Sequence, residues 1–290
     1  PNYSFLKEAK VYIVYGTTKK QLDISSVSFS QTFTEETRSV KTLHNQNNMF
    51  EGSVINTANP ANFELRTNLL IEDASKIVFD RLTDTNSFDL YISTESDVFK
   101  LEKCVITNGT INIERLRPLS LSISGQASKL IPSSSVPSGM TLRTTSSSRT
   151  YNLNKDLFVS LGGASISDHL VSVSIELQNE VKWIPYKTVN TASGTRYPTQ
   201  YTIDKKVLAG NIRRYLNDDT ESASQSYGLN QSLRIKAGTN IGGLFKGIDF
   251  NSNNCSITQR IQTGTVFMKN TDWRMVQNPS SISGVLTYFT

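Results

Sequence analysis

The chain repeats its own strand pattern at an offset of 146 residues. The segment Val11–Gly16 (VYIVYG) aligns with Leu157–Gly162 (LFVSLG), and Ser26–Phe29 then falls on Ser172–Ile175 without a gap. A repeat of this length predicts two similar domains, each large enough to bury a core. It also means that three copies of the chain would supply six related units, which suits a ring.

Further short matches extend the repeat, and its gaps fall in loops. The matched segments are Val40–Leu43 with Tyr186–Val189, Ala74–Ile77 with Ala209–Ile212, Cys104–Thr107 with Cys255–Thr258, and Ser122–Gly125 with Ser281–Gly284. Their offsets predict that the second copy has lost 11 residues before Ala209 and gained an insertion around 217–247. We interpret the series as a duplication, with domains at 1–130 and 151–290 and a Ser/Thr/Pro-rich linker at 131–150. The alternative is two unrelated β domains that share alternating patterns.

Composition agrees with strands that have one wet face. Hydrophobic residues make up 37% of the 290 residues, and serine, threonine and asparagine fill the difference. The net charge is +5, but positive and negative residues are interspersed, which indicates a mixed solvated surface rather than a nucleic-acid stripe. There is no apolar run of membrane-spanning or signal-peptide length, so we expect no membrane partner and a chain that is made and folded in a cytoplasm.

Strands dominate the predicted secondary structure, in an α+β plan with little helix. Apolar residues alternate with serines in 26–30, 119–125 and 171–178, a period typical of half-buried strands. Further strands are predicted at 10–15, 87–92, 97–107, 109–114, 199–203, 231–236 and 261–268, with a hairpin turn at Asn108–Gly109. The expected fold is mainly β: two tandem sandwich or barrel units, each with one flanking helix.

One helix is predicted in each copy from apolar residues at helical spacing. The first is 71–82, and the second is 204–216 with Asp204 as its N-cap. The polar segment His44–Pro60 is predicted to form a long projecting hairpin, with a shorter equivalent around 190–198.

The two cysteines, Cys104 and Cys255, occupy matched positions of the two copies. Matched sites in separate domains should lie farther apart than the ~7 Å Cα limit of a disulfide. We therefore predict two reduced, buried thiols.

The sequence gives no indication of catalysis, a metal or a cofactor. His44 and His169 lie outside any metal-ligand spacing, and a solvated histidine is the favoured interpretation for both. Gly238–Gly243 is glycine-rich, but Leu244 stands where a phosphate loop needs lysine. We expect a protein that is not an enzyme.

This plan resembles the tail tube proteins of long-tailed bacteriophages, in a duplicated form. The features that carry the resemblance are β-rich units with a helix, a long polar loop between early strands, and two fused copies. In the sequence these are Val11–Gly16, Ser26–Phe29, His44–Pro60, Ala74–Leu82 and Leu119–Gly125 with their counterparts.

The resemblance implies a trimeric, pseudo-hexameric ring that stacks into a virion tail tube and conducts DNA during ejection. Other tail proteins (tape measure, terminator, sheath or baseplate) would be its partners. Four strands from each unit would give about 24 strands and a lumen of roughly 27–38 Å, wide enough for a DNA duplex. Lumens in the family tend to be acidic, whereas this chain is net basic, so charge would have to be segregated between its faces.

Two sets of residues are candidates for these roles. The polar faces of two alternating strands are the predicted lumen lining, although an ordinary solvent face is the alternative: Ser26, Ser28, Ser30, Ser172, Ser174 and Glu176. The polar loop is predicted to contact the neighbouring ring: His44, Asn47, Asn48, Phe50 and Glu51.

Two other functions remain open from the sequence. A tube-end or baseplate component would use the same domain in one ring per tail. A carbohydrate-binding or adhesin β-sandwich would need exposed aromatic residues that converge on a groove, for which Trp183, Tyr186, Tyr197 and Tyr201 are the candidates.

Overall fold

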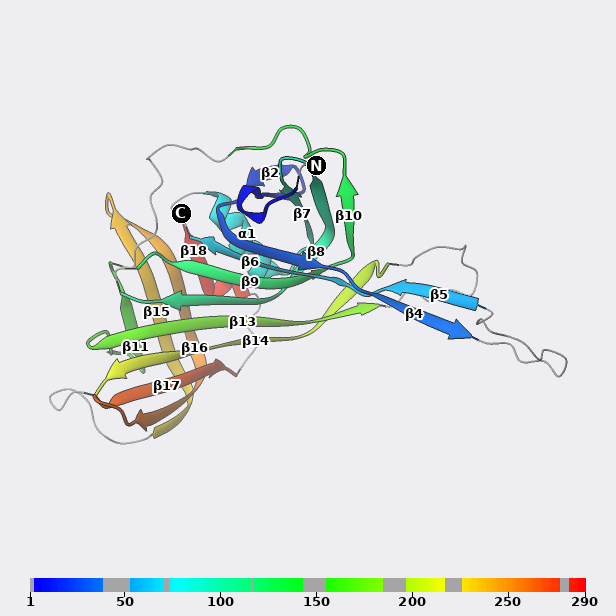
Figure 1. Ribbon diagram of the computed structural model, residues 1–290. Helices are drawn as coiled ribbons and strands as arrows, with labels where there is room; N and C mark the ends of the chain where they lie inside the picture. Colours follow the sequence, from blue (N-terminus) through cyan, green and yellow to red (C-terminus); the bar gives the residue numbers. More distant parts are fainter. Residues whose placement is uncertain are drawn as a thin grey trace, which may run out of the picture.

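The computed structural model describes residues 3–38, 53–69, 73–115, 117–142, 155–184, 197–216, 226–276 and 282–290. Nearly all regular structure is antiparallel β, and α1 (Asp73–Asp84) is the one α-helix of the described residues (Figure 1). The mainly β prediction is therefore confirmed. The strands of the first half of the chain are β1 (Lys10–Tyr15), β2 (Thr18–Gln21), β3 (Ile24–Ser30), β4 (Phe33–Arg38), β5 (Ser53–Ala58), β6 (Ala61–Asn68), β7 (Phe88–Ser93), β8 (Val98–Ile113), β9 (Ser120–Ala127) and β10 (Lys129–Ser133). Those of the second half are β11 (Phe158–Leu161), β12 (Ala164–Ser165), β13 (Leu170–Ile184), β14 (Gln200–Tyr215), β15 (Ser226–Ile241), β16 (Leu244–Gln262), β17 (Met268–Met275) and β18 (Leu286–Phe289).

Eight strands form one continuous sheet that crosses both halves of the chain. Their hydrogen-bonded order is β3, β6, β9, β8, β13, β14, β17 and β16. The β8–β13 ladder, from Val173 opposite Ile113 to Gln178 opposite Asn108, is the junction between the halves. We call these eight strands the continuous sheet.

The first parts of β8 and β16 leave the continuous sheet and join smaller flank sheets. The first flank sheet has the order β10, β8, β7, β1 and β2, and the second has the order β18, β16, β15, β11 and β12. Each half is therefore two layers of strands that share one long strand, with the apolar side chains packed between them.

The ladders of the first half recur in the second half in the same order. Tyr15 pairs with Thr18 as Leu161 pairs with Ala164, and Val27 pairs with Leu65 as Val173 pairs with Ile212. The matched residues of β1, β2 and β3 lie 146 positions apart, as the sequence predicts for the early strands, and Leu65 and Ile212 lie 147 apart. The matched strands are β1 and β11, β2 and β12, β3 and β13, β6 and β14, β7 and β15, β8 and β16, β9 and β17, and β10 and β18.

The helix predicted at 204–216 is wrong, because these residues belong to β14. Leu208 and Ile212 fit a helical spacing, but with Gly210 and Arg214 they also form one face of a strand. The match of Ala74–Ile77 with Ala209–Ile212 therefore fails, since the first segment lies in α1. The predicted 11-residue deletion falls with it, because Leu65 matches Ile212 at almost the original offset.

Three other local predictions are also wrong. Ser122–Gly125 lies in β9, whereas Ile282–Gly284 forms a 3-10 turn before β18, so these segments do not correspond. Asn108–Gly109 is not a turn, because β8 continues through it, and the strand predicted at 261–268 is divided between β16 and β17.

The segment predicted as a linker begins as structure of the first half. β10 pairs with β8, and Thr141 exchanges backbone hydrogen bonds with the β2 region. Residues 143–154 lie outside the described part.

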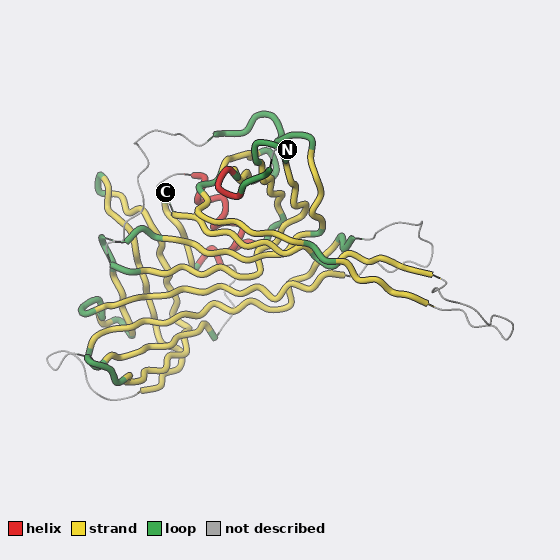
Figure 2. The backbone as a smooth tube through the Cα atoms, in the orientation of Figure 1, coloured by secondary structure: helices red, strands yellow, loops and turns green. Residues whose placement is uncertain are grey.

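Helix α1, predicted from its apolar spacing, packs on the apolar face of the continuous sheet near the junction of the halves (Figure 2). Leu82 lies on Gly109 of β8, where a Cβ would come within 2.5 Å of the Leu82 side chain. Phe79 packs on Tyr288 of β18 with ring centroids 5.6 Å apart. The helix therefore contacts elements of both halves.

The strands β4 and β5 form a two-stranded arm that projects from the body, as the sequence predicts for the early loop (Figure 1). Proline lacks an N–H, and Pro60 lies where the ladder breaks between the arm and β6. Asn59 closes this break: its backbone N–H donates to the Thr32 carbonyl, and its side-chain amide donates to Thr32 Oγ1 at 3.0 Å.

Candidate assembly surface

The continuous sheet has one apolar face and one polar face. The apolar face is covered by α1 and the flank sheets, whereas side chains of the polar face such as Ser28 and Glu64 are exposed. The ladders place all six residues predicted for the lumen on this polar face. Paired residues share a face of the sheet, and a series of pairs leads from Ser28 through Glu64, Ser124 and Asn108 to Gln178. The other predicted residues lie an even number of positions from Ser28 or Gln178 in the same strands, so they share this face. Ser26, Ser28 and Ser30 are exposed, whereas Ser172, Ser174 and Glu176 are half-buried.

The polar face of the first half is hollowed. A groove of about 380 Å³ runs across β3, β6, β9 and β8. Small hydroxyl and amide side chains dominate its lining, which includes Ser26, Ser28, Ser122, Ser124, Asn108 and Thr110. Such groups hydrogen-bond water without carrying charge, and the two charged residues of the lining, Glu64 and Arg66, have opposite signs. The surface of the groove is therefore hydrated and nearly neutral.

Charges on the polar face are few and nearly balanced. The cations are Arg66, Lys205, Arg213, Arg260 and Arg274, and the anions are Glu64, Glu176, Glu180 and Asp272. Asp272 pairs with Arg260 and accepts a 2.6 Å hydrogen bond from Asn211 Nδ2. Glu176 accepts from the amides of Asn108 at 3.2 Å and Gln178 at 2.7 Å. The face is therefore neither the acidic surface that the resemblance implies nor a basic one.

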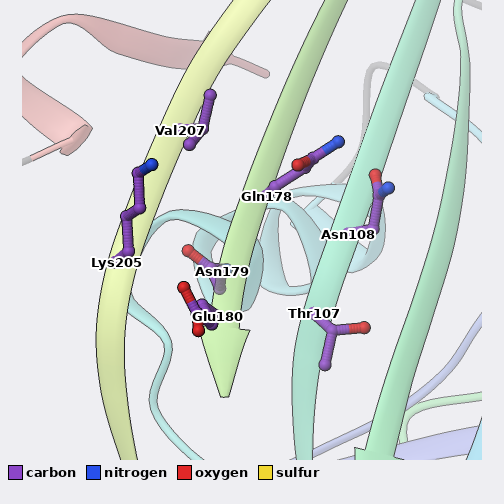
Figure 3. A pocket seen from close by; sticks show the side chains of 7 residues that line it. All are labelled: Thr107, Asn108, Gln178, Asn179, Glu180, Lys205 and Val207. Atoms are coloured by element: carbon purple, nitrogen blue, oxygen red, sulfur yellow. The ribbon is translucent and has the colours of Figure 1, made fainter.

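A pocket of about 490 Å³ opens where β8, β13 and β14 meet (Figure 3). Its lining is Thr107, Asn108, Gln178, Asn179, Glu180, Lys205 and Val207. Figure 3 shows α1 behind these strands, so the pocket lies at the junction of the two halves. Thr107 is the extra residue of a β-bulge in β8, and a register shift follows Glu180 in β13.

Asn179 connects three elements at this junction. Its Nδ2 donates to the carbonyls of Ile106 at 3.0 Å and Leu82 at 3.4 Å, which joins β13 to β8 and α1. Only 3% of the residue is exposed. Tyr201 of β14 extends the same contact, because its hydroxyl donates to the Thr85 carbonyl after α1. Burial lowers the pKa of the neighbouring Lys206, and the Asp84 carboxylate partly opposes this effect.

The aromatic residues considered for a sugar site are engaged in packing. Trp183 and Tyr201 have ring centroids 5.3 Å apart, and Trp183 Nε1 donates to Gln126 Oε1 at 3.0 Å. The Lys129 ammonium lies 5.2 Å from the Tyr197 ring centroid. All three aromatic residues are half-buried, and Tyr186 lies outside the described residues. Their arrangement favours strand packing over an open sugar-binding groove.

Both cysteines are buried free thiols, as predicted. The ladders confirm that the two cysteines match. Two residues after Cys104, Ile106 lies opposite Gly125 of β9. Two residues after Cys255, Ile257 lies opposite Trp273 of β17, which is the counterpart of Gly125. Burial raises the pKa of Cys104 well above its ordinary value and also raises that of Cys255. Both thiols therefore stay protonated and poorly nucleophilic near neutral pH.

The loop residues His44, Asn47, Asn48, Phe50 and Glu51 lie outside the described residues. His169 precedes β13 and has a φ of 59°, and its carbonyl accepts the Tyr215 N–H. Within the described ranges, no group of histidine, cysteine and acidic side chains could hold a metal ion. The helices in the same ranges include none of the length and apolarity needed to span a bilayer.

The sequence did not predict the two outer edges of the continuous sheet, on β3 and β16. Beyond β3 the described sheet has no further strand, and Arg260–Gln262 at the end of β16 pair only with β17. Such edges are ready to pair with another strand. Strand alternation alone could not locate them, because it gives each strand's faces but not its neighbours.

Comparison with known proteins assigns this architecture to a family. None of the curated proteins compared with the chain matches it. The model of a family described as the Bacteriophage Baseplate Tube Protein Family matches residues 1–288, which is nearly the whole chain. The chain therefore belongs to the Bacteriophage Baseplate Tube Protein Family and is a structural protein of the phage tail or baseplate.

Proposed function

We propose that three copies of the chain close into a ring in which β3 of one copy pairs with β16 of the next. The observation that carries this proposal is the β8–β13 ladder. The first half contributes four strands to the continuous sheet, and β8 is the last of them. This ladder joins β8 to β13, the first of the four strands that the second half contributes. Because β16 matches β8 and β3 matches β13, the same step between copies joins β16 to β3. We also infer that the halves are duplicated domains, at 1–130 and 151–290, and that the segment 131–150 between them begins as structure of the first half.

The size of such a ring suits a DNA conduit. Eight strands from each of three chains give about 24 strands, and a barrel of that number has a lumen of roughly 27–38 Å after side chains are allowed for. A DNA duplex is roughly 20 Å wide. The pseudo-hexameric ring therefore has room for passage of DNA during ejection.

In the proposed ring the polar face, including Ser26, Ser28, Ser30, Ser172, Ser174 and Glu176, surrounds the DNA. Dense positive charge would bind phosphates and hold the DNA in place. The nearly balanced charges and many serine hydroxyls instead provide a hydrated wall with little net attraction. This supports non-specific passage of DNA rather than binding.

The family description favours the tube segment of the baseplate over a tube of many identical rings. In that position the ring would contact other tail proteins above and below it, with the 44–51 loop among the contacting surfaces. The two arrangements differ in copy number. Quantitative gel densitometry of virions should give about three copies per tail for one ring and many times that for a stacked tube.

The ring itself is tested with the purified full chain at increasing concentration. Native mass spectrometry should give a species of about 97 kDa, three times the 32.3 kDa chain, and electron microscopy should show hollow rings. Ile261 at the free edge is half-buried, and a charge there would be buried in the seam between copies.

Ile261→Asp should therefore leave the circular dichroism spectrum unchanged and abolish the rings. The matched control is Ile241→Asp at the exposed β15–β16 hairpin, which should still form rings. A wild-type chain that stays at 32.3 kDa at every concentration would refute the ring.

A further inference from the structure

The strand β15 extends beyond the part that matches β7. In the first half, the β7–β8 ladder ends with Phe88 opposite Cys104. In the second half, β15 passes Cys255 and pairs Gly228 with Ile257, Tyr227 with Thr258, and Ser226 with Gln259. The second half therefore has a short extension, Ser226–Gly228, that the first half lacks.

This extension lies on one particular edge of β16. It is the edge that corresponds to the side of β8 on which β13 pairs. β17 covers Cys255–Gln262 on one side, so β15 must lie on the other side. Through the ladders with β9 and β17, Asn108 and Gly109 of β8 match Thr258 and Gln259 of β16. On β8 these two positions are paired with β13, whereas on β16 they are already paired with the extension. Only Arg260–Gln262 remain open for another strand.

The strand β3 ends at the point that fits this shortened edge. The last residue of β3 is Ser30, and its counterpart in β13 is Glu176. Glu176 pairs with Thr110 of β8, and the counterpart of Thr110 in β16 is Arg260. Gln31 is held inside its own chain: its Nε2 donates to the Asn59 and Ser128 carbonyls, and its Oε1 accepts from the Leu130 N–H at 2.9 Å. β3 can therefore supply Ser28, Phe29 and Ser30 to the open positions and then turns away.

We infer that Ser226–Gly228 act as a register stop for β3 of a second copy of this chain. This inference rests on the proposed ring. In the resulting register Ser28 lies opposite Gln262, Phe29 opposite Ile261, and Ser30 opposite Arg260. Phe29 and Ile261 are both half-buried in the single chain, and their counterparts Ile175 and Ile111 pair at the internal junction with 1% exposure each.

Other registers are disfavoured by the same edge. A slip of one residue moves Phe29 to the polar face, because side chains alternate between faces. A slip of two residues toward the extension places Ser30 opposite Thr258, where Tyr227 already pairs. The extension is a distinct segment, because the β15–β16 register shifts between Gly228 and Gln231 and Asn230 has a φ of 53°.

Cysteine cross-linking between copies tests this register. Ser28→Cys with Gln262→Cys reports the inferred register, and Ser28→Cys with Arg260→Cys reports the slip of two residues. All three residues are exposed in the single chain. Directly opposed residues of antiparallel strands have Cα atoms about 4.5–5.5 Å apart, within disulfide range. Mild oxidation should link the first pair into covalent trimers on a non-reducing gel and give at least about tenfold less of that product for the second pair.

Removal of the stop should allow the slip. Tyr227→Pro with Gly228→Pro removes backbone donors of the extension, so cross-linking of the Ser28→Cys, Arg260→Cys pair should rise at least about fivefold. If this variant does not fold, the comparison of the two cysteine pairs in the otherwise native chain still decides the question.

The outcomes separate the register stop from the ring. Equal cross-linking of both pairs in the otherwise native chain would overturn the stop and leave the ring in place. Rings in the microscope without cross-linking of either pair would also overturn it. Absence of both rings and cross-links would overturn the proposed ring together with the stop.

Discussion

Gly210 of β14 and Trp273 of β17 are cross-strand partners, and the indole occupies the space beside the glycine. A Cβ on Gly210 would lie 2.6 Å from Trp273 Cζ2 and 2.0 Å from the Ser174 carbonyl oxygen. The matching pair in the first half is Gly125 of β9 with Phe63 of β6. Each half thus places one large ring against one glycine, but the two strands have exchanged the large and the small residue.

Gly210→Ala should destabilise the protein, because the added methyl group overlaps both a backbone oxygen and the indole. We expect the free energy of unfolding to fall by about 1–3 kcal/mol, measured by urea denaturation. Gly264→Ala is the matched control, because the nearest atom to its Cβ, the Val266 carbonyl oxygen, is 3.4 Å away. Equal urea midpoints for Gly210→Ala and wild type would contradict this account of the pair.

Asn179→Ala should weaken the junction of the halves. It removes the hydrogen bonds from the buried Asn179 side chain to the Ile106 and Leu82 carbonyls. The expected loss is about 1–3 kcal/mol in the free energy of unfolding. Hydrogen exchange should also show faster opening of α1. The neighbouring exposed Gln178 provides the control: Gln178→Ala should change stability by less than about 0.5 kcal/mol. Similar losses for the two variants would argue against a special role for Asn179.

Stability should decline at alkaline pH partly through the two thiols. Burial raises the pKa of Cys104 and Cys255 in the folded chain, whereas an unfolded thiol titrates near pH ~8.5. Their contribution is therefore fully present below the unfolded pKa and is lost as the pH rises above it. Urea midpoints measured from pH 7.5 to 10 should fall less steeply for the Cys104→Ala, Cys255→Ala double variant. In the wild type, Ellman's reagent should react with both thiols in denaturant and with neither in the folded chain at pH 8.

Positive charge added to the polar face should make DNA stick to the proposed ring. Ser28→Arg with Ser174→Arg adds two cations per chain to this face, so DNA retention by the rings should increase and should weaken steeply with salt. Asn251→Arg, at an exposed position of β16 outside the continuous sheet, should leave retention nearly unchanged. Filter-binding assays at several salt concentrations would measure the difference. Equal retention for the two variants would argue against a lumen lined by Ser28 and Ser174.

Strand alternation predicted the parts of the fold that depend on one strand at a time. Ser26–Ser30 and the segment 171–178 alternate cleanly because one face is wet and the other is buried, and both lie in strands. The helix at Asp73–Asp84 was also predicted, since its apolar residues recur only at helical spacing. The placement of the six lumen candidates on one face follows from the same alternation, although their role in a lumen stays a prediction.

Other features depended on contacts that the sequence does not state. Leu208 and Ile212 fit both a helix and a strand, and pairing with β13 and β17 decided for the strand. Asn108–Gly109 has the composition of a turn, but here the glycine makes room for Leu82 against a continuous strand. The edges of the continuous sheet could not be predicted, because they depend on which strands lack a neighbour.

The β8–β13 ladder lies within one polypeptide, and this changes how the assembly of a closed collar would depend on protein concentration. Tethered partners meet at an effective concentration in the millimolar range, far above that of free subunits in solution. Half of the six seams of the collar would therefore form during folding of each chain. Only the other three would depend on encounters between molecules, so at equilibrium the amount of the proposed closed collar would scale with the third power of the free chain concentration instead of the sixth.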